Sequence, residues 1–363
     1  ALQFAIDECH KRGMEVHAWV VTIPVGKWNS YGCRQLRKRF PRLIKRIDQD
    51  GYMDPEATQT GCYLAEMCRE IVQRYDVDGI HLDYIRYPET WKFRIGKDQA
   101  RGNITRIVEK IHQAVKKEKP WVKMSCSPIG KFDDLSRYWS HGWNAYTKVA
   151  QDAQAWLKDG LMDELFPMMY FRGDQFFPFA IDWKEHSYGK IIAPGLGIYF
   201  LDPSEGNWTL DEIERQMHFI RAHGLAGEAH YRVKYLMDNT QGLYDALEED
   251  FYTAPALQPA MPWIDNVAPT PPSGLTVETP ENGYWKLSWQ PATDNDKRNA
   301  PMYVIYGSDT YPVDTSNPEN ILAQRVQGTE YTYAPIRPWT ARKYFAVTAI
   351  DRCGNESEAI QQQ

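Results

Sequence analysis

Apolar and polar positions follow two different periodicities along the first 232 residues of the chain. Apolar residues three or four apart predict amphipathic helices, and short β-branched or aromatic runs between turn residues predict strands. The expected helices cover 1–12, 62–75, 98–118, 146–161 and 209–224. The expected strands cover 14–21, 78–84, 122–128, 163–171, 190–199 and 227–232. Thr209 followed by Glu212 predicts a capping box at the start of the last helix, which Gly224 ends.

The regular alternation of strand and helix predicts an α/β fold with a parallel sheet and helical crossovers. Six strands are expected where eight would close a (β/α)8-type barrel, and the chain opens inside a helix. We therefore expect such a barrel with its first two β/α units missing from this chain. A doubly wound open sheet is the alternative, but no glycine-rich phosphate-binding motif follows any strand. Residues 23–57 are expected to form a long functional loop.

The pattern changes near residue 254, where a Pro-rich stretch begins. Beyond it, short alternating runs at 274–280, 284–292, 302–309, 331–336 and 343–351 predict an all-β sandwich. Trp289 in "LSWQPATD" and the segment "YFAVTAIDRCGNES" resemble a fibronectin type III domain. This resemblance implies that Trp289, Tyr303 and Tyr344 are core residues. The expected organisation is a barrel over 1–253, a linker over 254–267 and a fibronectin III-like sandwich over 268–363.

Composition narrows the classes of function. The net charge is −6 and no basic block stands out, so binding to nucleic acid or to an anionic membrane is not favoured. No apolar run approaches transmembrane length, and we expect any targeting segment to lie upstream of Ala1. The six cysteines lack metal-ligand spacing, so we expect no metal and no cofactor. The 13 Trp and 22 Tyr suit either a large core or a sugar-binding cleft.

Polar groups interrupt the strand 78–84, in the stretch "DVDGIHLDYIRYPET". Side chains alternate along a strand, so Gly79, His81 and Asp83 share one face while Ile80 and Leu82 share the other. If Ile80 and Leu82 pack under helices, Asp83 lies at the barrel mouth, where reacting groups of such barrels gather. Arg86 can then pair with Asp83 or with a second acid. The alternative is that Asp83 and Arg86 form a structural ion pair and that His81 is a core histidine.

A family resemblance covers residues 1 to about 250. The stretches "AIDECHKRGMEVHAWV", "VDGIHLDYIRYP", "DELFPMMYF" and "GEAHYR" together resemble the glycoside-hydrolase-like barrel family of the DUF187 type. That resemblance implies a glycosidase-type barrel, often exported, with two strands before Ala1. Some members of the family are implicated in cleaving the glycan strands of peptidoglycan. A weaker similarity to the nucleophile strand of α-amylase-type barrels implies that Asp83 is the nucleophile.

Glycoside hydrolysis uses two carboxyl groups, and the chain offers several partners for Asp83. Glu228 and Asp174 are the leading candidates for the second catalytic group, and Asp202 also follows a strand. Asp163 precedes its strand and is expected to be structural. Rings at strand ends can act as sugar platforms. The expected substrate-binding residues are His17, Trp19, His81, Tyr84, Arg86, Tyr170, Tyr199, His230 and Tyr231, and Tyr87 is a further ring candidate.

Three classes of function fit these residues. The first is an exported glycoside hydrolase that cleaves a bacterial polysaccharide by a two-carboxylate mechanism, with the sandwich as a spacer or attachment module. The second is a non-catalytic carbohydrate-binding protein on the same scaffold. The third is a metal-dependent deacetylase or amidohydrolase using His17, His81 and His230. The spacing of these histidines in the sequence does not match a known metal-ligand motif.

Overall fold

The chain forms two compact units. The computed structural model describes residues 1–138, 140, 142–278, 284–335 and 340–362. One unit is His17–Asp245, and the other joins Ala1–Val16 to Ala246–Gln363. The boundaries of these two units differ from those of the predicted barrel, linker and sandwich. The predicted domain boundaries therefore stay a prediction. Within the described part of the chain, no helix is both long and apolar enough to cross a membrane.

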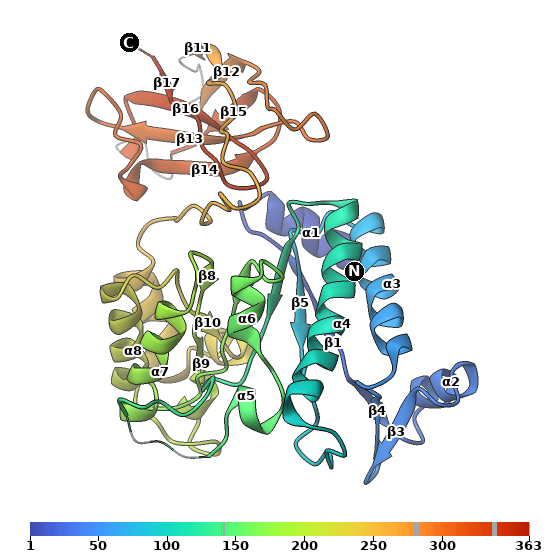
Figure 1. Cartoon of the computed structure of the whole chain (residues 1–363). Helices are drawn as coiled ribbons and strands as arrows, with labels where there is room; N and C mark the ends of the chain where they lie inside the picture. The colour runs from blue at the N-terminus through green and yellow to red at the C-terminus, as the bar shows by residue number, and fades with distance from the viewer. Residues whose placement is uncertain (139, 141, 279–283, 336–339, 363) are drawn as a thin grey trace. The chain divides into compact units, whose positions relative to one another are not determined.

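An arc of parallel strands frames the His17–Asp245 unit (Figure 1). The strands are β1 (His17–Val21), β5 (Gly79–Asp83), β6 (Lys123–Cys126), β7 (Glu164–Leu165), β8 (Ile191–Ile192), β9 (Gly195–Leu196) and β10 (Ala229–His230). The main sheet runs in chain order β1–β5–β6–β7–β8, and β9 pairs with β10. Parallel bridges from Met168 to Ile129 and to Gly195 connect the two sheets. Five of the six predicted strands have one counterpart each, whereas the strand expected over 190–199 divides into β8 and β9 and ends in a helical turn at Ile198–Leu201. The described strands show no reversal of order, which excludes the doubly wound alternative for them.

Helices of the two units account for most of the remaining regular structure. The α-helices are α1 (Leu2–His10), α2 (Tyr31–Arg39), α3 (Thr58–Arg74), α4 (Lys97–Glu118), α5 (Ala145–Lys148), α6 (Ala153–Lys158), α7 (Phe177–Glu185), α8 (Leu210–Ala222), α9 (Val233–Met237) and α10 (Leu243–Ala246). Shorter helical turns are η1 (Gly173–Gln175), η2 (Ile198–Leu201), η3 (Thr240–Gly242), η4 (Leu247–Phe251) and η5 (Pro318–Asn320).

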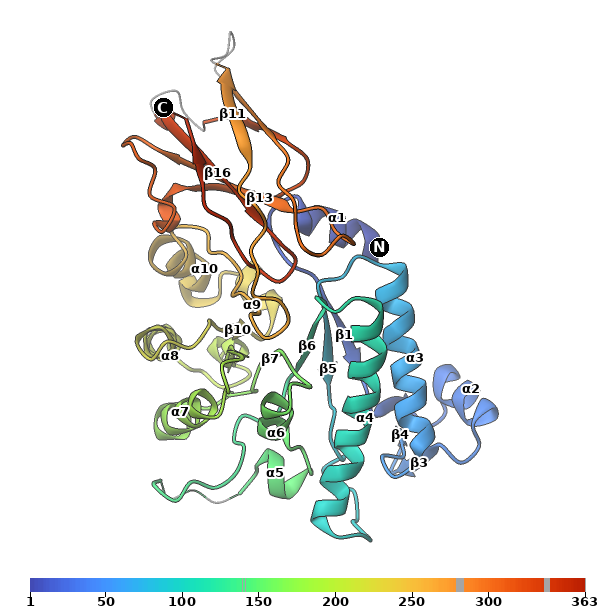
Figure 2. The same ribbon diagram turned by 45° about the horizontal axis from the view of Figure 1, so that its top comes forward.

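Helices α3 and α4 lie side by side next to the first strands of the arc (Figure 2). The contact is close because Gly61 of α3 faces α4: a Cβ at this position would lie 2.9 Å from a side-chain carbon of Lys110. Ile80 and Leu82 of β5 are fully buried, as their predicted packing under helices requires. The opposite face of β5, with Gly79, His81 and Asp83, is therefore the inner face of the arc.

The expected long loop is wrong: this region folds into a small domain-like insertion, residues 24–53. It contains the antiparallel sheet β2–β4–β3, formed by β2 (Pro24–Lys27), β3 (Ile44–Ile47) and β4 (Asp50–Met53), together with α2. Cys33 of α2 is buried against Gly51 of β4, where a Cβ would collide with its sulfur. In the chain, the insertion lies between the end of β1 and the start of α3.

The single helix expected over 146–161 is also wrong, because the chain breaks between α5 and α6. The fully buried Gln151 explains the break: its Oε1 accepts the Ile129 N–H at 3.0 Å, and its Nε2 donates to the Ile85 carbonyl at 3.3 Å. The Val149 carbonyl accepts the Tyr87 N–H at 3.0 Å. These long-range bonds fix the segment in a non-helical path that ties down the ends of β5 and β6.

The capping box predicted for α8 does not form. Thr209 is the N-cap residue, but its side chain makes no capping hydrogen bond. Glu212 instead accepts the Gly173 N–H at 3.2 Å and a Gln216 amide at 3.0 Å. The carboxylate of Glu212 therefore anchors η1, the turn that carries Asp174, onto α8.

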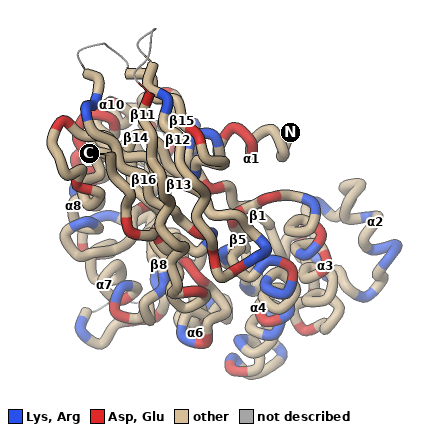
Figure 3. The backbone as a smooth tube through the Cα atoms, turned by 90° about the horizontal axis from the view of Figure 1, so that it is seen from above, with Lys and Arg blue, Asp and Glu red and all other residues tan. Residues whose placement is uncertain are grey.

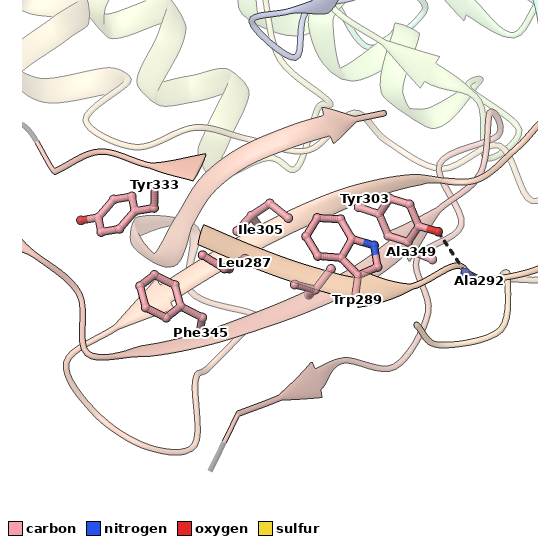
Figure 4. Close-up of a cluster of buried hydrophobic side chains, with 9 residues drawn as sticks. Leu287, Trp289, Ala292, Tyr303, Ile305, Tyr333, Phe345 and Ala349 are labelled. Carbon is pink, nitrogen blue, oxygen red and sulfur yellow. Dashed lines mark hydrogen bonds between the residues drawn. The ribbon is translucent and has the colours of Figure 1, made fainter. Parts of the chain in front are cut away.

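The second unit contains an all-β region made of two antiparallel sheets. One sheet is β11 (Ser273–Glu278), β12 (Trp285–Gln290) and β15 (Glu330–Tyr333), and the other is β14 (Ile321–Val326), β13 (Met302–Ser308), β16 (Tyr344–Ile350) and β17 (Ile360–Gln361). Residues from both sheets form one buried cluster, in which Trp289 and Tyr303 pack edge to face and the Tyr303 hydroxyl accepts the Ala292 N–H at 2.9 Å (Figure 4).

The expected core of this region is confirmed for Trp289 and Tyr303, which are 4% and 2% exposed. Tyr344 is only half-buried and packs at the edge of a second cluster. The ends of two predicted runs, Thr279–Pro280 and Ile336, lie outside the described residues. The fibronectin III assignment stays a prediction.

Candidate active site

Asp83 ends β5 on the inner face of the arc. Its Oδ1 accepts the Ser127 hydroxyl at 3.0 Å and the Tyr84 N–H at 2.7 Å. Its Oδ2 accepts no hydrogen bond from any residue that the structure describes. The Asp83 carbonyl is held by the N–H and the hydroxyl of Thr22, at 3.0 and 2.9 Å. The carboxylate is thus fixed through one oxygen and presents the other to an incoming group.

A buried layer lies directly below Asp83 on the same face. His81 Nδ1 and the Ser125 hydroxyl are 3.0 Å apart, and the Phe166 ring packs edge-on against the imidazole. Burial lowers the pKa of His81 to about 4, with the neighbouring His17 adding to the effect. A neutral, hydrogen-bonded imidazole is what the core-histidine interpretation predicts, and it makes His81 a support for the site above.

His17 and Glu164 add a second polar pair to the inner face. His17 Nδ1 lies 3.5 Å from a Glu164 carboxylate oxygen, and Gly79 makes room for the imidazole, since a Cβ there would collide with it. Glu164 stands beside Ser125 in the strand register, two residues below the level of Ser127. The pair therefore lies deeper than Asp83.

Acidification should destabilise the fold through His81 and His230. Burial lowers the pKa of each imidazole from 6.5 to about 4, so between these values the unfolded chain binds protons that the folded chain does not. Stability is therefore complete above about pH 6.5 and falls as the pH drops toward 4. Each histidine can contribute up to about 1.4 kcal/mol per pH unit within that window. Urea unfolding between pH 7 and 5 should show this slope.

The variant His81→Gln provides the control for this prediction. It removes one titrating group and leaves His230 and His112, whose pKa burial also lowers, in place. We therefore expect the slope of unfolding free energy against pH to become smaller without vanishing. An unchanged slope would show that His81 does not link folding to pH.

Three tyrosines form a cluster at the far end of the arc. The rings of Tyr170 and Tyr231 stack with centroids 5.6 Å apart, and Tyr199 lies edge-on to both, at 5.6 and 5.9 Å. Gly195 and Gly197 leave space for Tyr170: a Cβ at these positions would lie 3.4 and 3.1 Å from its atoms. Burial, the other two tyrosines and the Asp83 charge raise the pKa of Tyr170. The structure thus brings Tyr170, Tyr199 and Tyr231 together on the side that Asp83 faces.

The other predicted ring residues have different surroundings. Trp19 lies beside His81 in the register of β1 and β5 and is 62% exposed. Tyr87 is fully buried, and its hydroxyl accepts the Asn103 amide at 3.0 Å, so its expected role as a sugar platform is wrong.

Arg86 pairs with Glu89 rather than with Asp83. Its Nη2 donates to Glu89 at 2.7 Å, and its guanidinium lies 3.8 Å from the centre of the Tyr84 ring. Tyr84 has a left-handed backbone, with φ 54°, and its hydroxyl donates to the other Glu89 oxygen. Although burial opposes it, hydrogen bonding from Arg86 and Tyr84 lowers the pKa of Glu89. Arg86 and Tyr84 therefore hold an ionised carboxylate next to the end of β5.

The candidate second carboxylates lie in different environments. Asp174 is exposed on η1, four residues after Tyr170. In β10 the register pairs Ala229 with Gly195 and His230 with the buried Leu196, so alternation puts Glu228 with His230 on the outer face. Asp202 accepts the N–H and hydroxyl of Ser204 at 2.9 and 2.7 Å, which makes it a turn-forming residue.

Asp163 is structural, as expected. Its Oδ2 contacts Lys116 Nζ at 2.6 Å and accepts the Met124 N–H at 2.8 Å, and the side chain is 1% exposed. It ties α4 to the start of β6 on the outer face of the arc.

The three histidines of the metal-site hypothesis are not gathered. His17 contacts Glu164 and His81 contacts Ser125, whereas His230 lies on the outer face. Both ring nitrogens of His230 are buried without a hydrogen-bond partner among the described residues. Over the same residues, no group of three or more His, Cys, Asp or Glu side chains is arranged to hold a metal ion.

Sequence reasoning missed three polar residues of the site. Ser127 follows Ser125 at strand spacing in "MSCSPIG", so alternation alone could have placed its hydroxyl beside Asp83. Glu164 lies within a largely apolar segment, "LFPMMYF" following it directly, so the pattern predicted a strand but no polar site residue there. Glu89 lies beyond the end of the strand, where no periodicity applies.

The chain is similar to a glycosyl hydrolase-like family and to proteins named glycosyl hydrolases. Residues 1–100 and 92–199 match the family described as Glycosyl hydrolase-like 10. The glycosyl hydrolase YngK of Bacillus subtilis (strain 168) is 27% identical over 395 residues, which cover 99% of this chain and 76% of YngK. The glycosyl hydrolase DigH of Escherichia coli (strain K12) is 28% identical over 201 residues, covering 47% of this chain and 46% of DigH.

Among solved structures, the glycoside hydrolase domain of PgaB from Bordetella bronchiseptica aligns over 64% of this chain and 74% of its own, with 10% identity and a TM-score of 0.44. The family match covers more than half of the chain and includes β1, β5, β6 and β7. This chain belongs to the glycosyl hydrolase-like 10 family.

Proposed function

We propose that this chain hydrolyses glycosidic bonds of a bacterial polysaccharide, with Asp83 as a reacting carboxylate. The observation that carries the proposal is the position of Asp83: one oxygen is held by Ser127 and Tyr84, and the other is open on the inner face. The tyrosine cluster on the same side offers aromatic surfaces for sugar rings. Membership of a glycosyl hydrolase-like family supports the reaction class.

The proposed chemistry follows from the roles of the two carboxyl groups. Asp83 in its ionised form attacks the anomeric carbon, or deprotonates the water that does so, while a second carboxylic acid protonates the leaving oxygen. Water supplies the hydroxyl of the new reducing end, and the leaving sugar takes the proton. His81 and Phe166 form a packed layer below Asp83, whose carboxylate is held by Ser127 and Tyr84.

Asp174 is the better candidate for the second carboxyl group. It lies on the loop that follows the inner-face residue Tyr170, whereas alternation turns Glu228 to the outer face. We therefore expect Asp174→Asn to lower kcat by about 10²-fold, the usual contribution of a general acid. Glu228→Gln should leave kcat within about threefold of the wild type. The reverse order of effects would assign the role to Glu228.

Ser127 should act as a positioning residue for Asp83. Loss of a hydrogen bond to a charged group costs about 1.5–3 kcal/mol, so Ser127→Ala should lower kcat about tenfold or more. Ser125→Ala, which removes the hydroxyl one layer below, is the matched control. Equal losses of kcat in the two variants would remove Ser127 from the site.

The second candidate function is carbohydrate binding without catalysis. It is favoured by the absence, among the described residues, of a second carboxylate bonded into the same network as Asp83. Incubation with denuded peptidoglycan strands and a panel of polysaccharides separates the two. A hydrolase releases new reducing ends, whereas a binding protein retains the glycan and releases none.

We also propose the finer architecture and location that the sequence implies. Sequential parallel strands with polar groups at their carboxyl ends support a (β/α)8-type barrel. Three-stranded and four-stranded antiparallel sheets around Trp289 support a fibronectin III-like spacer or attachment module. An exported location suits an enzyme that acts on an extracellular or cell-wall polysaccharide.

A further inference from the structure

The insertion carries a charge opposite to that of the whole chain. Residues 27–53 contain eight Lys and Arg against two Asp, a formal net charge of +6 in a chain whose total is −6. Within 34–46 there are seven basic residues and no acidic one. Figure 3 shows the blue segments of Lys and Arg along α2. The expectation that no basic block stands out is therefore wrong at this scale, because the average over 363 residues hides a local excess.

Four of these cations face solvent without an acidic partner. Arg34, Lys38, Arg39 and Arg42 are exposed, and none forms an ion pair with a residue that the structure describes. Two nearby acids pair with other cations: Asp50 with Lys27 at 3.1 Å, and Asp54 with Lys45 at 3.3 Å. We call Arg34, Lys38, Arg39 and Arg42 the basic surface. Like charges held this close repel one another, so a bound anion would stabilise the arrangement.

An apolar hollow adjoins the basic surface. Its volume is about 360 Å³, and it is lined by Arg39, Phe40, Pro41, Arg42, Leu43, Ala57 and Gln59. The Arg39 guanidinium lies 5.1 Å from the Phe40 ring centre. A hollow with an aromatic wall and guanidinium groups at its rim suits a sugar ring that bears a carboxylate: the apolar face of the sugar packs on the ring, and arginine binds the anion.

The insertion begins at the end of the arc where Asp83 lies. It follows the last residue of β1, and Thr22, in the connection, donates two hydrogen bonds to the Asp83 carbonyl. Burial raises the pKa of Tyr52 of β4, and the charges of Asp50 and Glu89 add to this effect, so Tyr52 lies within electrostatic range of Glu89. The insertion therefore borders the end of the arc that carries Asp83.

We propose that the basic surface and the hollow beside it bind an anionic polysaccharide through its carboxylate groups, and so extend the substrate site. This inference rests on the proposed function for the identity of the partner, but binding itself does not require turnover. A membrane partner fits less well, because α2 buries Cys33, half-buries Leu36 and presents only Tyr31 as a large exposed apolar side chain. A nucleic acid fits less well because the Trp28 ring, the base-stacking candidate, is occupied by Arg37 at 3.7 Å.

The test measures binding with the Asp83→Asn chain, so that hydrolysis cannot consume the ligand. The probes are polygalacturonate oligosaccharides and the same oligosaccharides after complete methyl esterification, which removes the charge and keeps the sugar. We expect the acid form to bind, the ester form to bind at least about tenfold more weakly, and the acid-form affinity to fall between 20 and 500 mM NaCl.

Two triple variants locate the binding surface. Arg34→Gln/Lys38→Gln/Arg42→Gln removes three charges from the basic surface, and we expect it to weaken binding of the acid form about tenfold. Lys117→Gln/Lys158→Gln/Lys343→Gln removes three exposed charges elsewhere and should change the affinity less than twofold. Both variants alter only exposed side chains and carry the same net charge, so non-specific electrostatics would affect them equally.

Three results would overturn the inference: equal binding of acid and ester forms, equal effects of the two triple variants, or tighter binding to DNA or to phosphatidylglycerol vesicles than to any polysaccharide. Failure of this test leaves hydrolysis of neutral glycans by Asp83 untouched. Conversely, salt-sensitive binding without release of reducing ends would retain the surface and remove the proposed reaction.

Discussion

Replacing Asp83 with asparagine should lower kcat by about 10³-fold or more while leaving the fold intact. The Asn side-chain oxygen can still accept the Ser127 hydroxyl and the Tyr84 N–H, so the local hydrogen bonds survive. Only the second oxygen, which has no partner among the described residues, becomes an amide nitrogen. An amide can neither attack the anomeric carbon nor accept a proton from water, and a factor of 10³ corresponds to about 4 kcal/mol of transition-state stabilisation.

Asp202→Asn is the matched control for this experiment. Asp202 also follows a strand of the arc, but its carboxylate is bonded to Ser204 within its own turn. We expect its kcat to stay within about threefold of the wild type. Equal losses in both variants would mean that the charge of the region, and not a reacting group, is what the Asp83 change removes.

Replacing Asp163 with asparagine should reduce the free energy of unfolding by about 3 kcal/mol or more. Asp163 is 1% exposed and compensates the charge of Lys116, whose side chain is 12% exposed and also donates to the carbonyls of Pro120 and Val122. Removing one partner of a buried ion pair leaves the other charge uncompensated. The midpoint of urea-induced unfolding should fall accordingly.

The double variant Lys116→Met/Asp163→Leu tests the cause of this loss. Removing both charges leaves none buried, so we expect the double variant to be more stable than Asp163→Asn. A double variant that is less stable than the single one would show that the hydrogen bond from Met124, and not the charge of Lys116, dominates.

Local patterns predicted the frame of the fold well. The period of two along β5 correctly separated Ile80 and Leu82 from Gly79, His81 and Asp83. The parallel strands followed from the alternation of strand and helix. These features depend on neighbours within one turn or one strand, which is the information that hydrophobic periodicity carries.

Features set by distant contacts were not predictable in the same way. The break between α5 and α6 depends on Gln151, which bonds Ile129 and Ile85 far away in the sequence. Helix α7 has no clear amphipathic pattern to reveal it, because Phe177 and Ile181 are apolar in addition to the buried Phe179, Ala180 and Trp183. The sheet of the insertion consists of four-residue strands that composition does not distinguish from a loop.

In the candidate site, too, the residues on strands were predictable from the sequence, whereas those beyond the strand ends were not. Asp83 followed from its place at a strand end, and its hydroxyl partner Ser127 follows from alternation on the neighbouring strand. Tyr84 adopts a left-handed backbone, so alternation fails beyond it. Arg86 therefore pairs with Glu89, and Tyr87 enters the core instead of lining the site.

The most direct measurement is the release of reducing ends from polysaccharides in H₂¹⁸O by the wild-type chain and by Asp83→Asn, side by side. We expect new reducing ends that carry ¹⁸O at the anomeric carbon with the wild type, and none above background with the variant. Release at the same rate by both proteins would contradict the role of Asp83. Binding of glycan without any release by the wild type would contradict the proposed hydrolysis itself.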